Sequence, residues 1–179
     1  MIEDSKAIEK IVKKAMHGNI DAYGRLIELN KQYLYRTAFL YVKNEDLALD
    51  VVQECILKGF STINNLREPK YFKSWITRIL INSANDILKK SIKYTPIEEV
   101  EVAMTEENIE LEQRLDLYDA IDVLPHKYRS VIILKYFDNL KISEIAYTMD
   151  IPEGSVKAYL SRAKEELKKY LKEDYVYAK

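Results

Sequence analysis

The stretch from Ile142 to Leu160 constrains the fold more than any other part of the chain, because its residue types match a helix-turn-helix. It reads ISEIAYTMDIPEGSVKAYL. Small Ala146 falls where two crossing helices approach most closely, and Asp150 falls at the turn position that tolerates a left-handed backbone. The expected buried contacts come from Ile151, Val156 and Leu160. This pattern is typical of proteins that read duplex DNA with the second of the two helices.

Residues that break helices are scarce. The 179 residues include only 4 Gly and 4 Pro, and the run from Asp21 to Val42 contains no Pro and only Gly24. Because Gly and Pro are the residues that most disfavour helix interiors, we expect an all-α fold. Apolar residues make up 47% of the chain, which suffices for packed cores, and the length allows one domain or two small ones.

Several classes of protein are disfavoured by what the sequence lacks. The longest apolar runs, such as Val131 to Leu134, stop far short of the roughly 18 residues of a membrane span. No basic and apolar leader opens the chain, so we expect a cytoplasmic protein. The single Cys55 excludes an internal disulfide, and with His17 and His126 far apart the usual ligand spacings do not occur. We therefore expect neither a metal nor another cofactor.

Charge divides the chain into three parts. Residues 1–90 hold 15 basic against 11 acidic side chains, residues 91–113 hold one Lys against seven Glu, and residues 114–179 hold 12 against 11. The acidic segment contains Pro96 and a single aromatic residue, Tyr94, so its first half is not expected to pack a core. We predict an acidic linker over 91–113 between helical domains at 1–90 and 114–179. A single domain with a solvated acidic loop is the alternative, although such a long loop is unusual.

In the first domain we expect four helices, over about residues 2–16, 21–42, 45–60 and 69–90. Gly18 ends the first, Asp21 and Asn44 cap the second and third, and Pro69 opens the fourth. The third helix has an apolar face made by Leu47, Ala48, Val51, Val52, Cys55, Ile56 and Phe60. We interpret Cys55 as a buried packing residue and not as a redox switch.

Basic and aromatic residues alternate from Arg67 to Lys90. The basic side chains are Arg67, Lys70, Lys73, Arg78, Lys89 and Lys90, and between them stand Tyr71, Phe72, Trp75, Asn82 and Asn85. Cations that follow phosphates and aromatic rings that receive unstacked bases are the means by which proteins hold single-stranded nucleic acid. Apolar rings at helical spacing are more often core residues, so the polar and basic side chains are the better candidates.

In the second domain we expect helices over about residues 106–123, 125–137, 141–149 and 153–171. On the last helix an apolar stripe should face inward: Val156, Leu160, Ala163, Leu167 and Leu171. The outward side of its first turns is then Ser155, Lys157, Ala158, Ser161 and Arg162. A recognition helix presents such positions to base edges, where Arg162 could bridge guanine and Ala158 could contact a thymine methyl. The alternative is an ordinary solvated basic face.

With these residues in place, the chain resembles a bacterial RNA polymerase sigma factor of the sigma-70 family. The similarity is to the small extracytoplasmic function (ECF) group, which retains only the second and fourth conserved regions. It rests on DLALDVVQECILKGF at 46–60, on YFKSWITRILINSANDILKK at 71–90, and on the stretch from Leu124 to Leu171 that contains the helix-turn-helix. The resemblance covers nearly the whole chain.

The resemblance implies a function and a set of sites. Residues 1–90 correspond to sigma region 2 and residues 114–179 to sigma region 4. Contact with the coiled coil of the polymerase largest subunit is implied for Leu49, Asp50, Gln53, Glu54 and Leu57. Capture of the non-template strand of the promoter minus ten element is implied for Arg67, Lys70, Lys73, Arg78, Asn82, Asp86 and Lys89. Recognition of the duplex minus thirty-five element is implied for Ser155, Lys157, Ala158, Ser161 and Arg162.

The resemblance also implies further partners, and three positions of this sequence differ from residues that are common in the family. Further partners are the polymerase flap and an anti-sigma factor, which in this family is often membrane-anchored, and the free protein is expected to be a monomer. The acidic linker is expected to thread toward the polymerase active site and RNA exit. Asp86 stands where the family usually has Asn, and Lys157 and Ser161 stand where Arg and an aromatic are common. The promoter sequence that this protein recognises therefore cannot be inferred from the promoters of the family.

Two other classes of function fit the sequence less well. A conventional helix-turn-helix regulator of operator DNA needs a dimerisation surface, and no heptad zipper or ligand domain is apparent. An enzyme is disfavoured because no nucleophile with a base, no phosphate-cradling Gly loop and no carboxylate metal motif stands out. The net charge of −1 predicts weak binding to free duplex, so promoter specificity is expected only in the polymerase holoenzyme.

Overall fold

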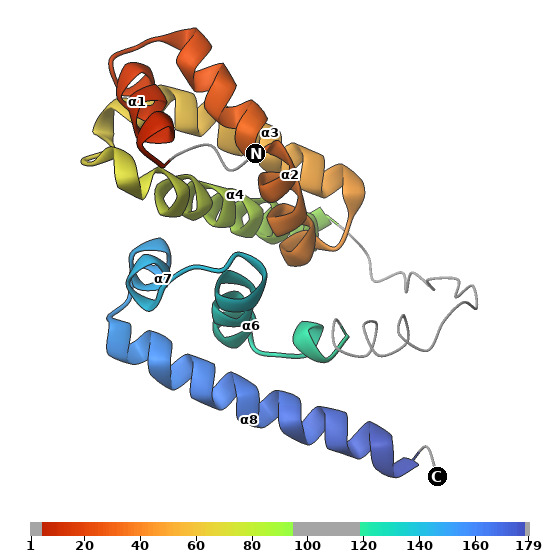
Figure 1. The fold of residues 1–179 in the computed structure, drawn as a ribbon. Helices are drawn as coiled ribbons and strands as arrows, with labels where there is room; N and C mark the ends of the chain where they lie inside the picture. The colour runs from red at the N-terminus through yellow and green to blue at the C-terminus, as the bar shows by residue number, and fades with distance from the viewer. Residues whose placement is uncertain (1–4, 95–118, 178–179) are drawn as a thin grey trace. The chain divides into compact units, whose positions relative to one another are not determined.

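The computed structural model describes residues 5–94 and 119–177, and over these ranges the chain forms helices and no strands (Figure 1). The helices are α1 (Ser5–Met16), α2 (Ile20–Val42), α3 (Glu45–Thr62), α4 (Phe72–Tyr94), α6 (His126–Ile132), α7 (Ile142–Met149) and α8 (Glu153–Tyr177). Single turns occupy Ile63–Asn65 and Pro69–Tyr71, a π-helical turn over Ile133–Phe137 continues α6, and residues 119–122 are also helical. The predicted all-α fold is confirmed.

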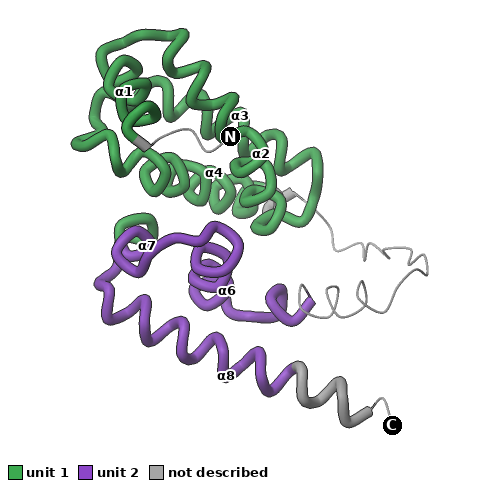
Figure 2. Tube along the Cα trace, in the orientation of Figure 1, with its two compact units in different colours: residues 1–94, 147–150 green, residues 95–146, 151–179 purple. Residues whose placement is uncertain are grey.

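The described residues form two compact units, coloured separately in Figure 2. The first comprises 5–94 and the short segment 147–150, and the second comprises 119–146 and 151–177. Two small helical domains were expected, and both are present. Most of the predicted acidic linker lies outside the described residues, and 91–94 belong to α4, which extends to Tyr94 instead of ending near residue 90. The predicted domain boundaries stay predictions.

Polar side chains set the starts of α2 and α3. Asn19 has extended backbone angles, and its Oδ1 accepts a 2.7 Å hydrogen bond from the backbone N–H of Ala22. The prediction of Asp21 as the cap of α2 is therefore wrong; Asp21 lies in the first turn, where its negative charge favours the helix dipole. Asn44 caps α3 as predicted, because its Oδ1 accepts from the N–H of Leu47 at 2.9 Å.

The core of the first unit lies where α2, α3 and α4 pack against one another, with α1 packed on α2. Fully buried apolar side chains from all four helices meet there: Val12, Leu26, Leu34, Val51, Cys55, Ile76 and Leu80. Cys55 is buried, as predicted, and its Sγ lies 3.6 Å from the carbonyl oxygen of Ile76. Burial of this apolar surface is what orders the three long helices.

One residue of the predicted apolar face of α3 lies elsewhere. Phe60 is 47% exposed, and the buried position next to it is Gly59. A Cβ on Gly59 would lie 2.5 Å from the hydroxyl oxygen of Tyr23 and 2.9 Å from Cδ1 of Ile76. The helix approaches its neighbours too closely here for any side chain, so the larger ring of Phe60 points outward, 5.4 Å from the ring of Tyr23.

In the second unit, α6 packs against α8. The buried side chains of this unit include Ile121, Val131, Ile133, Leu134, Leu140 and Ile145. The predicted stripe on α8 is buried at Val156, Leu160 and Ala163 and half-buried at Leu167, whereas the side chain of Leu171 lies outside the described set. The first part of the helix predicted over 106–123 also lies outside it.

The turn between α7 and α8 has the geometry that its sequence predicted. Asp150 adopts a left-handed conformation with φ of 57°. The N–H of Asp150 donates to the carbonyl of Tyr147 at 3.4 Å, and the N–H of Ile151 donates to the carbonyl of Ala146 at 3.1 Å. This pair of bonds is the Schellman arrangement that ends a helix and redirects the chain. The helix-turn-helix is therefore present, with Ile151 half-buried instead of fully buried.

Candidate nucleic-acid and protein interfaces

The outer side of α3 presents apolar side chains to solvent. Leu49 is 49% exposed and Leu57 is 66% exposed, while Ala48, Val51 and Cys55 on the opposite side are fully buried. Between the two leucines lie Asp50 and Gln53, both exposed, and the half-buried Glu54. The five residues predicted for polymerase contact thus share one helix face.

Such a face suits a protein partner. Exposed leucines flanked by polar and acidic groups form an apolar centre with a polar rim, as in protein–protein interfaces. Phe60 lies one turn beyond Leu57 and adds a further exposed apolar ring. Helical periodicity predicts Phe60 in the core, so it was not among the predicted contact residues; the neighbouring Gly59 is the sequence signal that could have placed it outside.

A groove of about 530 Å³ separates the polar sides of α3 and α4. It is lined by Asp50, Gln53, Glu54, Leu57, Lys58, Ser83, Asp86, Ile87, Lys89 and Lys90. Within it, Nζ of Lys58 lies 3.2 Å from Oε1 of Glu54 and 3.6 Å from Oδ2 of Asp86. The groove therefore brings together residues predicted for two different partners, polymerase and promoter DNA.

Lys58 lies on the polar side of α3 and lines the groove. Its position four residues after Glu54 predicts an ion pair along the helix. Its second partner, Asp86, is on another helix, and no spacing in the sequence connects the two.

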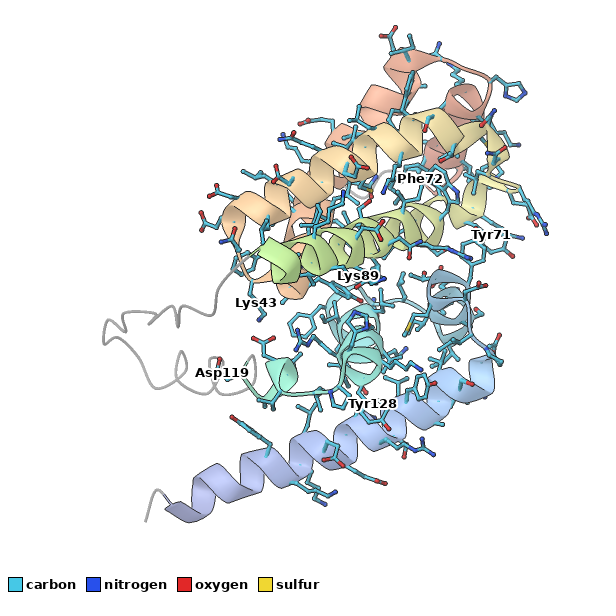
Figure 3. All side chains as sticks on the ribbon, turned by 180° about the vertical axis from the view of Figure 1, so that it is seen from behind. Lys43, Tyr71, Phe72, Lys89, Asp119 and Tyr128 are labelled. Atoms are coloured by element: carbon cyan, nitrogen blue, oxygen red, sulfur yellow. The ribbon has the colours of Figure 1, made fainter. Side chains whose placement is uncertain are left out.

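The residues predicted to hold the minus ten strand are distributed along α4 and the turns before it. Arg67, Lys70, Lys73, Asn82, Asp86 and Lys89 are exposed, whereas Arg78 is half-buried. Figure 3 shows Tyr71 and Phe72 where α4 begins and Lys89 near its other end. The candidate surface therefore runs the length of the helix.

Two of these lysines are oriented by neighbours. Nζ of Lys70 lies 2.7 Å from Oε2 of Glu68, and this hydrogen bond raises the pKa of Lys70, which keeps the ammonium charged. Nζ of Lys73 lies 4.7 Å from the ring centroid of Tyr33, within cation–π distance. The hydroxyl of Tyr33 in turn lies 2.6 Å from Oγ1 of Thr77, which fixes the ring. Both lysine side chains remain exposed at the surface.

Most of the aromatic residues on α4 belong to the core. Phe72 is 4% exposed and Trp75 is 8% exposed, with their ring centroids 6.0 Å apart. The prediction that rings at this spacing pack inward is confirmed. Tyr71, at 41% exposure, is the ring of this stretch that could stack on a base.

The recognition face of α8 is polar and accessible. Lys157, Ala158, Ser161 and Arg162 are exposed, and Ser155 is half-buried. The orientation follows from the buried side, because Val156, Leu160 and Ala163 leave the opposite side outward. On the flank, Tyr128 of α6 packs against Tyr159 of α8 with ring centroids 5.8 Å apart. The four exposed side chains thus stand on a helix whose rotation is held by packing.

The described ranges offer no site for a metal ion, and their one cysteine is buried. Among residues 5–94 and 119–177, no group of three His, Cys, Asp or Glu side chains could hold a metal ion. Burial raises the pKa of the Cys55 thiol to about 12, so this sulfur is not a thiolate at neutral pH. Likewise, no helix in the described part is long and apolar enough to cross a membrane.

Two family models match the chain. Sigma-70 region 2 matches residues 26–92, and Sigma-70, region 4, matches residues 114–167. The first contains α3 and α4 with their groove, and the second contains the helix-turn-helix. Both candidate surfaces therefore lie in segments that this family shares.

Similar proteins and structures agree with these matches. RNA polymerase sigma factor SigV of Bacillus subtilis is 40% identical over 75% of this chain and 81% of its own length. ECF RNA polymerase sigma factor SigW of the same organism is 30% identical over 93% of this chain and 97% of its own length.

Solved structures share the fold. CnrH in complex with the cytosolic domain of CnrY aligns with a TM-score of 0.73 at 20% identity, covering 96% of this chain and 99% of that one. The sigma factor RpoE from Bartonella quintana aligns with a TM-score of 0.70 at 22% identity, covering 86% and 98%. From the relatives and the two family matches, the chain belongs to the sigma-70 family of RNA polymerase sigma factors, in its ECF group.

Proposed function

We propose that the chain binds core RNA polymerase and directs transcription initiation at specific promoters, without enzymatic activity of its own. The outer face of α3 carries the proposal, since Leu49 and Leu57 stay exposed on a helix whose other side is fully buried. Leaving such leucines in water is unfavourable unless a partner covers them. The coiled coil of the polymerase largest subunit is the proposed partner, with Asp50, Gln53 and Glu54 at the rim.

The two DNA-binding roles follow from the charge and exposure of the other surfaces. The exposed basic and amide side chains along α4, with Tyr71 at its start, suit a single strand whose phosphates and bases must both be held. The exposed polar face of α8 suits the edges of base pairs in a major groove. We assign the first to the minus ten element and the second to the minus thirty-five element.

An anti-sigma factor is the proposed regulator. The Bartonella quintana protein is described in complex with the anti-sigma factor NepR, and CnrH with the cytosolic domain of CnrY. We propose that a protein of this class covers the polymerase-binding face of α3 in the cytoplasm. The free protein is proposed to be a monomer.

A conventional operator-binding regulator is disfavoured by the first unit. A regulator of that class needs the helix-turn-helix but has no use for a second family segment over residues 26–92. In our proposal that segment supplies polymerase binding and strand capture, so both family segments have a role.

Run-off transcription tests the proposal. Core polymerase is incubated with and without the protein on genomic fragments from its host, and the transcripts are sequenced. The expected result is a set of starts that depend on the protein and share motifs at minus thirty-five and minus ten spacings. If no start depends on the protein and it does not co-purify with core polymerase, the proposal is wrong. The helix-turn-helix would then be interpreted as that of a conventional operator-binding regulator.

A further inference from the structure

One side of α1 is almost entirely basic. Val12 and Ala15 on the other side are buried in the first unit, at 0% and 2% exposure. Successive residues of a helix are rotated by about 100°, so the positions opposite Val12 can be read from the spacing. These positions carry the exposed side chains of Lys6, Lys10, Lys13, Lys14 and, directly after the helix, His17.

The overall composition does not explain this basic side. α1 holds four Lys against one Glu, whereas the whole chain has a net charge of −1. The acidic residue of α1, Glu9, is half-buried at the edge of the basic side. Lysines four residues apart on a helix repel each other, as do Lys10 and Lys14. Lys6 and Lys10 also lie outside the last turn, where the helix dipole would favour a positive charge. The arrangement is therefore unfavourable for α1 by itself and favourable for a ligand of opposite charge.

This helix lies beside the surface proposed for the minus ten strand. It packs against the single turns Ile63–Asn65 and Pro69–Tyr71, as can be followed in Figure 1. Arg67 lies between these turns and Lys70 lies in the second, and both are exposed. The basic side of α1 therefore adds to the positive charge at the same end of the first unit.

The residue types on this side indicate which anionic ligand fits. Single strands are held by aromatic rings between cations, and α1 contains no Phe, Tyr or Trp. Lysines act as flexible point charges that bind phosphates without reading bases. Residues four apart on a helix are about 6 Å apart along its axis, which is close to the separation of successive phosphates in one strand. An anionic membrane fits less well, because a helix at a membrane surface inserts its apolar side, and here Val12 and Ala15 are buried in the unit.

We propose that the basic side of α1 binds phosphates of the duplex DNA that borders the minus ten element. The inference rests on the proposed function, because it takes promoter DNA as the ligand. It adds a third DNA-binding surface to those on α4 and α8. This surface contributes affinity and salt dependence but no base preference.

The test uses holoenzyme assembled from core polymerase and the full chain. Its ligand is labelled promoter DNA in which a single-stranded minus ten element is flanked by duplex. The triple variant Lys10→Gln, Lys13→Gln, Lys14→Gln is expected to bind this DNA about tenfold or more weakly, and the slope of log affinity against log salt should fall by about 2–3. Both proteins should bind a single-stranded minus ten oligonucleotide equally and unfold at the same temperature.

Two kinds of variant provide the controls. The triple variant with Arg in place of the same three lysines keeps the positive charges and should bind like wild type. Lys31 of α2 is also exposed, at 58%, but lies outside the basic side of α1. Lys31→Gln should therefore leave the salt slope unchanged, whereas Lys13→Gln should lower it by about 1.

Neutral methylphosphonate linkages locate the contact on the DNA. They are placed one at a time in the duplex on either side of the minus ten element. At about two or three adjacent positions the neutral linkage should weaken binding by wild type and leave the Gln triple variant unaffected. Contacts made by core polymerase would affect both proteins alike.

Three results would overturn the inference. The first is an equal affinity and salt slope of wild type and the Gln triple variant on the flanked DNA. The second is an equal loss on the single-stranded oligonucleotide, which would assign α1 to strand capture. The third is a loss of affinity for core polymerase without DNA, which would assign the basic side to an acidic protein surface. Failure of the proposed function is a different outcome, since no transcript would then depend on the wild-type protein.

Discussion

The hydroxyl of Tyr23 on α2 donates a 2.8 Å hydrogen bond to the carbonyl oxygen of Ile56 on α3. Burial raises the pKa of this phenol, so it stays protonated and remains a donor. The same hydroxyl oxygen lies close to Gly59, where a Cβ would be 2.5 Å from it. One contact therefore both joins the two helices and explains why this turn of α3 carries a glycine.

Gly59→Ala is expected to destabilise the first unit by about 1–3 kcal/mol, because the added methyl forces Tyr23 and Ile76 apart. Urea unfolding of the full chain, followed by circular dichroism, measures the loss. Gly24→Ala is the matched control: it lies within α2 with no neighbouring atom within 4 Å, so it should stabilise by about 0.5–1 kcal/mol. Equal effects of the two substitutions would contradict the packing described at Gly59.

Asn44→Ala is expected to lower the free energy of unfolding by about 0.5–2 kcal/mol, because the N–H of Leu47 loses its acceptor. Asn44→Asp keeps an acceptor oxygen and adds a negative charge at the N-terminus of α3, so it should remain near wild type. The comparison is made by chemical denaturation. An equal loss in both variants would show that the side-chain cap contributes nothing.

Leu57→Ser is expected to weaken binding to core polymerase about tenfold or more, because the leucine is 66% exposed and forms part of the proposed contact. Its thermal unfolding midpoint should not change. Ile20→Ser removes an equally exposed apolar side chain, 67%, from the start of α2 and should leave the affinity unchanged. Fluorescence anisotropy with labelled protein measures the affinity of each variant for core polymerase. Equal affinities of the two variants would show that Leu57 is not part of the interface.

Arg162→Ala is expected to reduce initiation about tenfold and to relax preference at one base pair of the minus thirty-five element, as loss of a bidentate contact would. Lys168→Ala, an exposed position farther along α8, should do neither. Transcription from promoters with single base-pair changes measures the preference. A uniform loss across all promoter variants would indicate that Arg162 contacts phosphate instead of a base.

The Cys55 thiol gives a pH dependence of known sign. Its pKa is raised from 9.0 to about 12 by burial, partly opposed by the charge of Lys58. The stabilisation that comes from keeping the buried Cys55 thiol protonated is therefore fully present below pH 9. It is lost as the pH rises toward 12, because the thiol of the unfolded chain releases its proton at lower pH than the thiol of the folded chain. Unfolding free energy should fall above pH 9 more steeply in wild type than in Cys55→Ala, by at most about 1.4 kcal/mol per pH unit. Parallel slopes would mean that the thiol is more accessible than its burial indicates.

Local features of the sequence predicted the helices and their turns. The scarcity of Gly and Pro left long stretches with no conformation more favourable than helix, Asn44 supplied an acceptor at the start of α3, and Asp150 tolerated the left-handed turn. These effects act over a few residues, so the sequence carries them directly. The same holds for the outward positions on α8, because the apolar stripe determines the opposite side.

Only the tertiary structure decided features in which two helices meet. Periodicity placed Phe60 in the core, yet the close approach at Gly59 turned it outward. Asn19 and not Asp21 caps α2, since the cap must precede the first helical residue with an extended backbone. The bridge from Lys58 to Asp86 joins side chains of different helices. Which side chains meet across helices depends on interaxial packing, and that packing is determined by the shape of the whole core and not by any local spacing.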